Sequence, residues 1–293
     1  MSSPVRRRRR QSRGPRTAAA VLLAPSTLFM SLLFLWPLGV GISQAIHGPH
    51  GFTTDRLRQM VEDPQFWPSV RNTVLLIAVV IPVQFAVAIV MALLLRANPR
   101  FSQGWFYLWV IPLAISDLAA GLVWLSVFAD QGYLNSILVD LGLPTYSWLS
   151  YQHPVTMFLC VAIAEIWRAT SLVLVIVVAG MQSIPRDYEE AAEVFGATYW
   201  QRLRYVLLPQ LRPSLQVALI LRTVLALQTF AVAQALTGQN FPLLVGQTYH
   251  WYNTLQSPEV AAAMALVVLG LSLATSMVYL RALRDRTPGG NPR

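Results

Sequence analysis

Residues 189–213 read EEAAEVFGATYWQRLRYVLLPQLRP, and they form the longest polar segment between two strongly apolar ones. The glutamates and alanines at its start favour helix, and Gly196 is expected to end that helix because glycine is a poor helix former. The helical pattern resumes from Tyr199 to Leu208, and Pro209 and Pro213 are predicted to interrupt it. From periodicity alone, the segment is equally consistent with a loop that lies on a membrane surface.

The composition of the chain is that of a membrane protein. Of its 293 residues, 55% are hydrophobic and only 12% are charged, about half the charged fraction of an ordinary soluble domain. Apolar runs of about 20 residues or more recur, and each is long enough to cross a hydrocarbon core as a helix. The sequence therefore predicts an all-α, polytopic fold. Six transmembrane helices are expected, at residues 18–45, 72–95, 105–128, 154–180, 214–236 and 259–281.

The positions of the arginines predict the orientation in the membrane. All 22 basic residues are arginine, and 17 of them lie in the two terminal segments and in the loops at 96–104 and 181–213. Only three lie in the loops on the opposite side. The positive-inside rule therefore places both termini and residues 189–213 in the cytoplasm. The same asymmetry accounts for the net charge of +9, so that this charge does not indicate nucleic-acid binding.

The chain divides into four expected parts. They are a cytoplasmic basic tail (1–16), a first transmembrane helix with an outer loop (17–66), a core of five transmembrane helices (67–283) that includes the cytoplasmic loop 181–213, and a C-terminal tail (284–293). Cys160, the single cysteine, cannot form an internal disulfide. The sequence has neither a G-x-x-x-x-G-K-[ST] phosphate loop nor an H-E-x-x-H motif, so it predicts no ATP site or metal site of those kinds.

The polar loop carries a family pattern. Glu190-Ala191-Ala192, then Gly196, then Val206-x-Leu208-Pro209 resemble the EAA loop of bacterial ABC-importer permeases, which docks into a groove on the ATP-hydrolysing subunit. The small alanine side chains would allow close approach of that subunit. The ATPase-coupling residues that this resemblance implies are Glu190, Ala191, Ala192, Gly196, Leu208 and Pro209.

The resemblance extends along nearly the whole chain. AEIWR at 164–168, AGMQSIP at 179–185 and LTG at 236–238 are similar to segments of sugar-importer permeases of the maltose type. A type I ABC importer permease fold is therefore expected. The chain departs from the family pattern at Asp117, where an uncharged residue is usual, and at 238–241, where the family often has Gly-Gly-Gly-Pro. These differences leave the solute open but not the class of transporter.

The resemblance also implies an assembly. The chain would form half of the translocation path for a sugar, such as a di- or oligosaccharide, or for a sugar-like solute. Its partners would be a second homologous permease, two ATPase subunits, an extracytoplasmic solute-binding protein and the lipid bilayer. The chain itself is expected to be no enzyme and to bind no cofactor or metal, because ATP and Mg²⁺ would lie on the ATPase subunits. It would be a multi-pass protein of the bacterial cell membrane.

Polar residues inside the expected spans are the candidates for contact with solute. Charges in a bilayer are costly and usually face the interior of a helix bundle. Because sugars bind through hydrogen bonds and aromatic stacking, the candidates for the path are Asp117, Trp124, Gln228 and Gln234. Glu165 and Arg168 lie three residues apart on one helical face and are expected to pair. These two, with Arg222, are interpreted as structural or path residues.

Other functions remain open at this point. A permease for a glycerol-phosphate-type solute would belong to the same family. An ion-coupled secondary transporter would need ion-coupling residues near the membrane midplane and usually recognisable repeat halves. A membrane scaffold would transport nothing. ATP-dependent uptake in the presence of the implied partners separates the importer from the last two.

Overall fold

A computed structural model describes residues 15–48, 51–97 and 102–282, and almost all of them are helical. Within these ranges the strands are limited to one antiparallel pair, β1 (His47–Gly48) and β2 (Gly51–Phe52). The prediction of an all-α fold is therefore confirmed. The two predicted tails lie outside the described residues, apart from Pro15 and Arg16 at the start of the first helix.

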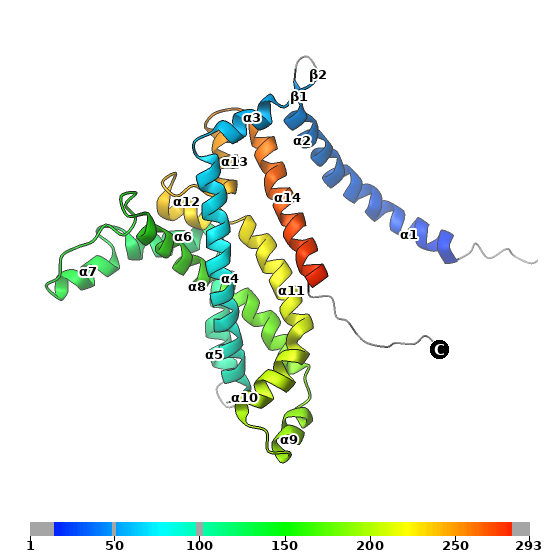
Figure 1. The fold of residues 1–293 in the computed structure, drawn as a ribbon, viewed down its shortest axis with the longest axis vertical. Coiled ribbons are helices and arrows are strands. Elements are labelled where there is room, and N and C mark those ends of the chain that lie inside the picture. The colour runs from blue at the N-terminus through cyan, green and yellow to red at the C-terminus, as the bar shows by residue number, and fades with distance from the viewer. Residues whose placement is uncertain (1–14, 49–50, 98–101, 283–293) are drawn as a thin grey trace, which may run out of the picture.

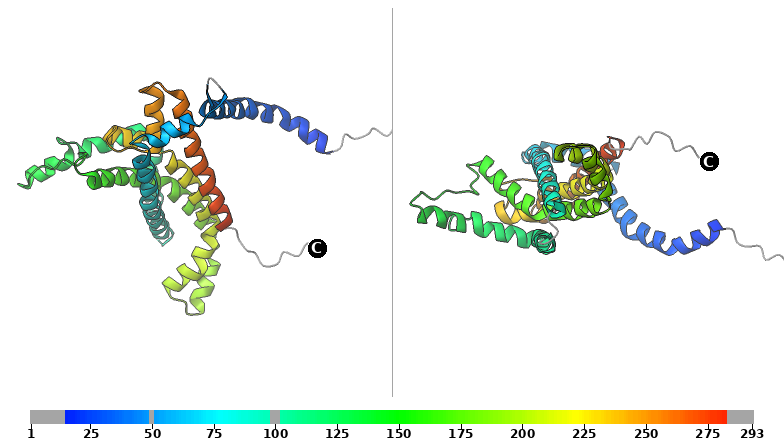
Figure 2. Two further views of the ribbon diagram at one scale, coloured as in Figure 1. Left: turned by 45° about the horizontal axis from the view of Figure 1, so that its top comes forward. Right: turned by 90° about the horizontal axis from the view of Figure 1, so that it is seen from below.

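The first helical segment projects away from the rest of the molecule at its N-terminal end, and its C-terminal end packs against the last helix of the chain (Figures 1 and 2). It consists of α1 (Pro15–Met30), a π-helical turn (Ser31–Leu35) and α2 (Trp36–Ile46), in agreement with the first expected span. The π-helical turn ends two residues before Pro37, whose backbone nitrogen has no hydrogen to donate. Most of the apolar side chains of this segment are exposed, as expected for a helix whose solvent is lipid.

The remaining elements form a helical bundle. In chain order they are α3 (Asp55–Glu62), α4 (Phe66–Ala97), α5 (Ser102–Val110), a 3-10 turn (Ile111–Ala114), α6 (Asp117–Phe128), α7 (Tyr133–Asp140), α8 (Pro154–Gln182), α9 (Asp187–Val194), α10 (Tyr199–Arg202), a π-helical turn (Leu203–Leu207), α11 (Leu208–Leu227), α12 (Ala231–Thr237), α13 (Leu244–Asn253) and α14 (Pro258–Ala282). In the described part of the chain, five helices are long and apolar enough to cross a membrane, or six when one bent pair is counted as a span. The predictions for the second, fourth and sixth spans are confirmed by α4, α8 and α14.

The prediction of a single third span at 105–128 is wrong. Residues 111–116 break the helix into α5 and α6, and the apolar helical stretch begins instead at Asp117 and continues to Asp140. Two local features explain the break. Pro112 favours the short 3-10 turn, and Ser116 caps α6 by accepting a hydrogen bond from the Ala119 amide at 3.2 Å.

The fifth span also differs from the prediction. Pro209 and Pro213 do not interrupt the helix, which runs from Tyr199 to Leu227 and absorbs the prolines through the π-helical turn just before them. The break comes later, between α11 and α12, where the helix axis bends by 44°. The expected span 214–236 is therefore two helices joined at residues 228–230.

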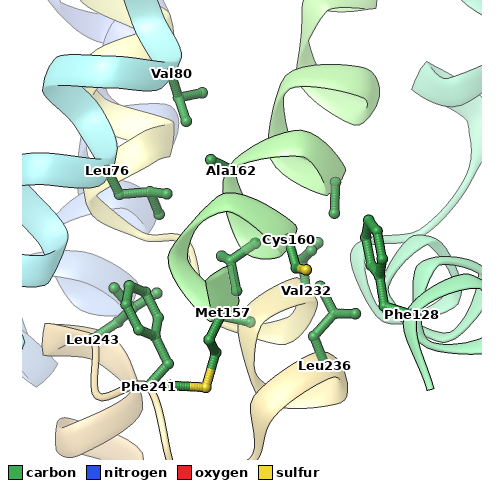
Figure 3. Close-up of a cluster of buried hydrophobic side chains, with 13 residues drawn as sticks. Leu76, Val80, Phe128, Met157, Cys160, Ala162, Val232, Leu236, Phe241 and Leu243 are labelled. Carbon is green, nitrogen blue, oxygen red and sulfur yellow. The ribbon is translucent and has the colours of Figure 1, made fainter. Parts of the chain in front are cut away.

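The apolar interior of the bundle lies where α4, α6, α8 and α12 meet (Figure 3). Leu76 and Val80 of α4 point toward α8 from one side, and Phe128 of α6 lies on the other side of α8, near Cys160. Each of these side chains, and that of Met157 on α8, is at most 6% exposed. A second cluster, toward α9, joins the last turns of α4 and α8 to the start of α11. Packing between helices therefore continues down to the loop that contains α9.

Glycine permits the closest approach between α8 and α11. A Cβ atom at Gly180 would lie 2.6 Å from the Ser214 Cβ, which is closer than two such atoms can come. Gly121 permits a similarly close approach between α6 and α12, because a Cβ atom at this position would lie 2.6 Å from the Ala235 Cβ. Small residues at such crossings allow helices to pack tightly within a membrane.

We therefore predict that Gly180→Ala forces α8 and α11 apart and destabilises the fold by about 1–3 kcal/mol. Thermal unfolding of the purified protein in detergent measures this change. The matched control is Gly270→Ala on α14, where a Cβ would meet no atom within 4 Å, and this variant should be as stable as the unmodified chain. Equal melting temperatures for the two variants would contradict the close approach.

Candidate functional site

A buried carboxylate lies near the middle of α8. The Glu165 side chain is only 1% exposed, and its two oxygens accept hydrogen bonds from three side chains. Arg222 Nη2 donates to Oε1 at 2.7 Å, Arg168 Nη2 donates to Oε1 at 2.9 Å, and Thr229 Oγ1 donates to Oε1 at 3.3 Å. Arg168 Nε donates to Oε2 at 3.3 Å. The predicted pairing of Glu165 with Arg168 is thus observed.

Arg222 connects three helices through this carboxylate. It lies on α11, is 1% exposed, and donates from Nε to Gln84 Oε1 of α4 at 2.7 Å. Gln84 in turn donates to the backbone oxygen of Glu165 at 2.9 Å. A buried charge is tolerated in a membrane bundle when it is paired and hydrogen-bonded in this way. The geometry therefore supports the structural interpretation of Arg222.

Asp117 joins the same group from the first turn of α6. Its carboxylate accepts from Arg168 Nη1 at 2.7 Å, and its side chain is 52% exposed while that of Arg168 is 17% exposed. We call the six residues that these bonds connect the intramembrane polar network. They are Gln84, Asp117, Glu165, Arg168, Arg222 and Thr229. Its two carboxylates and two guanidinium groups balance in charge.

The other candidates for the solute path lie beside this network rather than within it. Trp124 stacks on Phe128 with ring centroids 5.2 Å apart and meets the edge of Trp167 on α8 at 6.0 Å. Its indole nitrogen is buried and has no hydrogen-bond partner among the described residues. Gln228 is exposed at the break after α11, next to Thr229, and Gln234 is half-buried in α12. The structure brings Asp117 into contact with Arg168 but leaves the two glutamines outside the network.

Helix α9 lies at one end of the bundle (Figure 1) and contains Glu190, Ala191 and Ala192, the first residues of the EAA pattern. Glu190 and Ala191 are exposed, and Ala192 is half-buried. Next to them, Val194 and Phe195 are 85% and 90% exposed, so an unusually apolar surface accompanies the exposed glutamate.

Gly196 ends α9 as predicted. Its φ is +79°, a left-handed backbone conformation that glycine adopts at little cost. The Gly196 amide donates to the Glu193 oxygen at 2.8 Å, and the Ala197 amide donates to the Ala192 oxygen at 2.9 Å. This pair of bonds is a Schellman motif, which satisfies the last carbonyl groups of the helix. Thr198 and Gln201 then form a capping box that starts α10.

Two of the expected coupling residues lie farther along, in α11. Leu208 is half-buried and packs against the cluster of apolar residues near α9, and Pro209 is half-buried beside it. Sequence reasoning missed the residues that bind the inner face of α9. Arg96 of α4 forms an ion pair with Glu189 at 2.5 Å, and Arg202 pairs with Glu193. It also missed Gln84, although a glutamine within an apolar span is itself a signal of contact between helices.

Comparison with known proteins identifies the family. The family described as binding-protein-dependent transport system inner membrane component matches residues 70–286. The chain belongs to this family. It is 32% identical over 298 residues to the sulfoquinovosyl glycerol transport system permease protein SmoG of Agrobacterium fabrum, with 93% of this chain and 92% of that protein covered. It is 30% identical over 230 residues to the trehalose/maltose transport system permease protein MalF of Thermococcus litoralis, with 76% of each chain covered.

The fold of this inner membrane component also has solved counterparts. A crystal structure of a bacterial ABC transporter involved in the import of the acidic polysaccharide alginate contains a chain that matches it with a TM-score of 0.80 and 20% identity. The match covers 93% of this chain and 97% of that one. The expected type I importer permease fold is thereby confirmed, and the protein is a multi-pass membrane permease.

The network predicts unequal effects on stability. Glu165→Ala leaves the Arg222 guanidinium buried without its carboxylate, and we expect a loss of about 3–5 kcal/mol. Asp117→Asn removes a partly exposed pair and should cost less than about 1 kcal/mol. Melting temperatures of the purified variants measure both changes. A double variant, Glu165→Met with Arg222→Met, should be more stable than Glu165→Ala because it leaves no unpaired charge. The opposite order would show that the pair does not hold the bundle together.

Proposed function

We propose that this chain is one of two membrane subunits of an ATP-driven, binding-protein-dependent importer, and that it forms half of the path for a carbohydrate or a carbohydrate-like solute. The observation that carries the proposal is α9. It is short, exposed on its outer face and fixed to the bundle on its inner face. Such an element suits the transfer of force between an attached ATPase and the spans, because a rigid contact passes movement to whatever holds it.

The proposed assembly has partners on both sides of the membrane. A second homologous permease would complete the path, and two ATPase subunits would bind ATP and Mg²⁺ and dock on α9 of each permease. An extracytoplasmic binding protein would deliver solute, as the family description implies. A crystal structure of the alginate transporter in complex with an alginate pentasaccharide-bound periplasmic protein is a structural neighbour with a TM-score of 0.79.

The class of solute follows from the relatives. The permeases SmoG and MalF, with which the chain shares 32% and 30% identity, are named for sulfoquinovosyl glycerol and for trehalose and maltose. We propose that Asp117 and Gln228 offer hydrogen bonds to hydroxyl groups and that Trp124 packs against the apolar face of a sugar ring. A glycerol-phosphate-type solute is the alternative within the family. The match to a binding-protein-dependent family favours either of these over ion-coupled secondary transport.

The proposed orientation places α9 and both termini in the cytoplasm. It rests on the distribution of the arginines between the two sides. The turn that leads into α7 at Gly132–Asn135 would then lie on the outer side, where Asn135 holds the following loop by accepting from the Tyr146 amide at 3.1 Å and the Trp148 indole at 3.0 Å.

The docking role predicts specific defects. Glu190→Ala should weaken association with the ATPase subunits about tenfold or more, because it removes an acceptor for a charge-assisted hydrogen bond. Ala191→Trp should block docking by its bulk, since Ala191 is exposed and the new side chain disturbs no packing. Purification of the assembled complex, with ATPase and uptake rates, measures both effects. The control is Glu62→Ala, which changes an exposed glutamate on α3. Normal assembly and uptake in both α9 variants would refute the docking role.

The path makes a separate prediction. Asp117→Asn, Trp124→Ala and Gln228→Ala should each raise the concentration for half-maximal uptake by about tenfold, as expected for the loss of one polar or stacking contact with solute. Uptake of radiolabelled trehalose, lactose and sulfoquinovosyl glycerol over a range of concentrations tests this, with Leu122→Ala on the exposed face of α6 as the control. If any of these sugars is transported and all three variants transport it normally, the path lies elsewhere.

A further inference from the structure

The inner face of α9 is held by two ion pairs. Glu189 and Glu193 are four residues apart and therefore lie on the same side of the helix. Arg96 binds the first and Arg202 binds the second. Glu190, between them, forms no ion pair with any described residue and is exposed. Glu190 lies beside the two ion pairs and lines the same hollow, whereas the opposite side of the helix carries Ala191 and Val194, which are exposed.

The two anchors differ in what they connect. Arg202 belongs to α10, which follows α9 after a short turn, so the backbone already joins these two helices. Arg96 lies at the end of α4, more than 85 residues earlier in the chain. No short stretch of backbone joins α4 to α9, because α5 to α8 lie between them in the chain. Among the described residues, Arg96 is therefore the ionic contact that attaches α9 to this span.

Arg96 binds more than one group. Its guanidinium donates to the backbone oxygens of Met181 and of Ile184, the latter at 3.1 Å. It also forms an ion pair with Glu189 Oε1 at 2.5 Å. Met181 lies in the last turn of α8, where carbonyl groups lack helical partners and the helix dipole is negative. The planar guanidinium presents its donors in a fixed fork, whereas the ammonium group of a lysine is a compact charge without that fixed geometry. Its side chain is only 14% exposed, so that these bonds are largely shielded from water.

The same two spans carry the intramembrane polar network. Gln84 lies 12 residues before Arg96 on α4, which is about 18 Å along the helix. Glu165 lies on α8, whose end Arg96 binds. A displacement of α9 is thus linked through one side chain to both helices that meet at the network.

We propose that Arg96 is the positioning residue for coupling: it makes α9 move as one body with α4 and α8, so that movement of a docked ATPase reaches the solute path. This inference rests on the proposed function of α9 and names the residue through which that function acts. Glu190 and the alanines would receive the ATPase, and Arg96 would pass its movement on. Without Arg96, α9 would still bind the ATPase, but it would move relative to α4 and α8 instead of moving with them.

The test compares solute moved per ATP hydrolysed by the assembled importer in proteoliposomes. Arg96→Ala should lower this ratio about fivefold or more while ATPase association changes less than about twofold. Arg96→Lys should be intermediate because it keeps the charge but not the planar fork. Glu189→Gln should also lower the ratio, because it removes the charge of the α9 group that Arg96 binds, whereas the bonds to Met181 and Ile184 end on α8 and the turn after it. The control is Arg212→Ala, an exposed arginine on α11. A purely structural role would lower the amount of folded protein and leave the ratio unchanged.

A second measurement does not depend on transport. Spin labels at Leu94→Cys and Phe195→Cys, in a Cys160→Ala background of the full chain in lipid nanodiscs, report the distance between α4 and the end of α9; both labelled positions are exposed. Arg96→Ala should broaden the distance distribution, and Arg212→Ala should not. A narrow, unchanged distribution together with a normal ratio overturns the inference. If the unmodified complex transports none of the tested sugars but Arg96→Ala still broadens the distribution, the positioning role stands and the proposed function fails.

Discussion

The buried carboxylate of Glu165 is the constraint on which the arrangement of the spans depends. In a bilayer, an apolar side chain gains little free energy when it exchanges contact with lipid for contact with a neighbouring helix. Apolar packing alone therefore does little to fix the positions of the helices. A buried charge is different, because leaving it without a partner is costly and its partners must lie in fixed directions. Glu165 on α8 accepts from Arg222 on α11 and from Arg168, which in turn binds Asp117 on α6. Gln84 adds α4. Four helices are thereby placed relative to one carboxylate.

This arrangement extends to the loop at the end of the bundle. The helices α4 and α8 are joined at two levels. Gln84 binds Glu165 within the polar network, and Arg96 binds the last turn of α8 near α9. Apolar side chains fill the space between these levels, where Val173, Val177 and Ala88 are all fully buried. Close-packed interiors are stiff and transmit displacement instead of absorbing it. Under the proposed function, the bundle would therefore move as one body between the network and α9.

Much of this could be predicted from the sequence, and the failures share a cause. Long apolar runs predicted α4, α8 and α14, the pattern around Gly196 predicted the end of α9, and a three-residue spacing predicted the pairing of Glu165 with Arg168. These are local signals. The bonds from Arg222 to Gln84 and to Glu165 join residues 138 and 57 positions apart, and no periodicity encodes such contacts. The sequence shows Arg96 only as a positive charge after an apolar run, since its acceptors are backbone oxygens of a distant turn.

The two spans that were predicted to be continuous are both broken, and both breaks have the same structural consequence. Both unexpected breaks, at 111–116 and at 228–230, deliver a side chain to the network: Asp117 follows the first, and Thr229 lies in the second. Apolar composition cannot reveal such breaks, because the residues on either side are as hydrophobic as those of an intact span. Yet a broken helix leaves backbone groups unpaired, and a bilayer tolerates this only where protein or a water-filled cavity surrounds them. We therefore expect the breaks to face protein or water, and not lipid, in the assembled transporter. Since Asp117 and Gln228 are the exposed polar residues at these two breaks, this is the face on which we place the path.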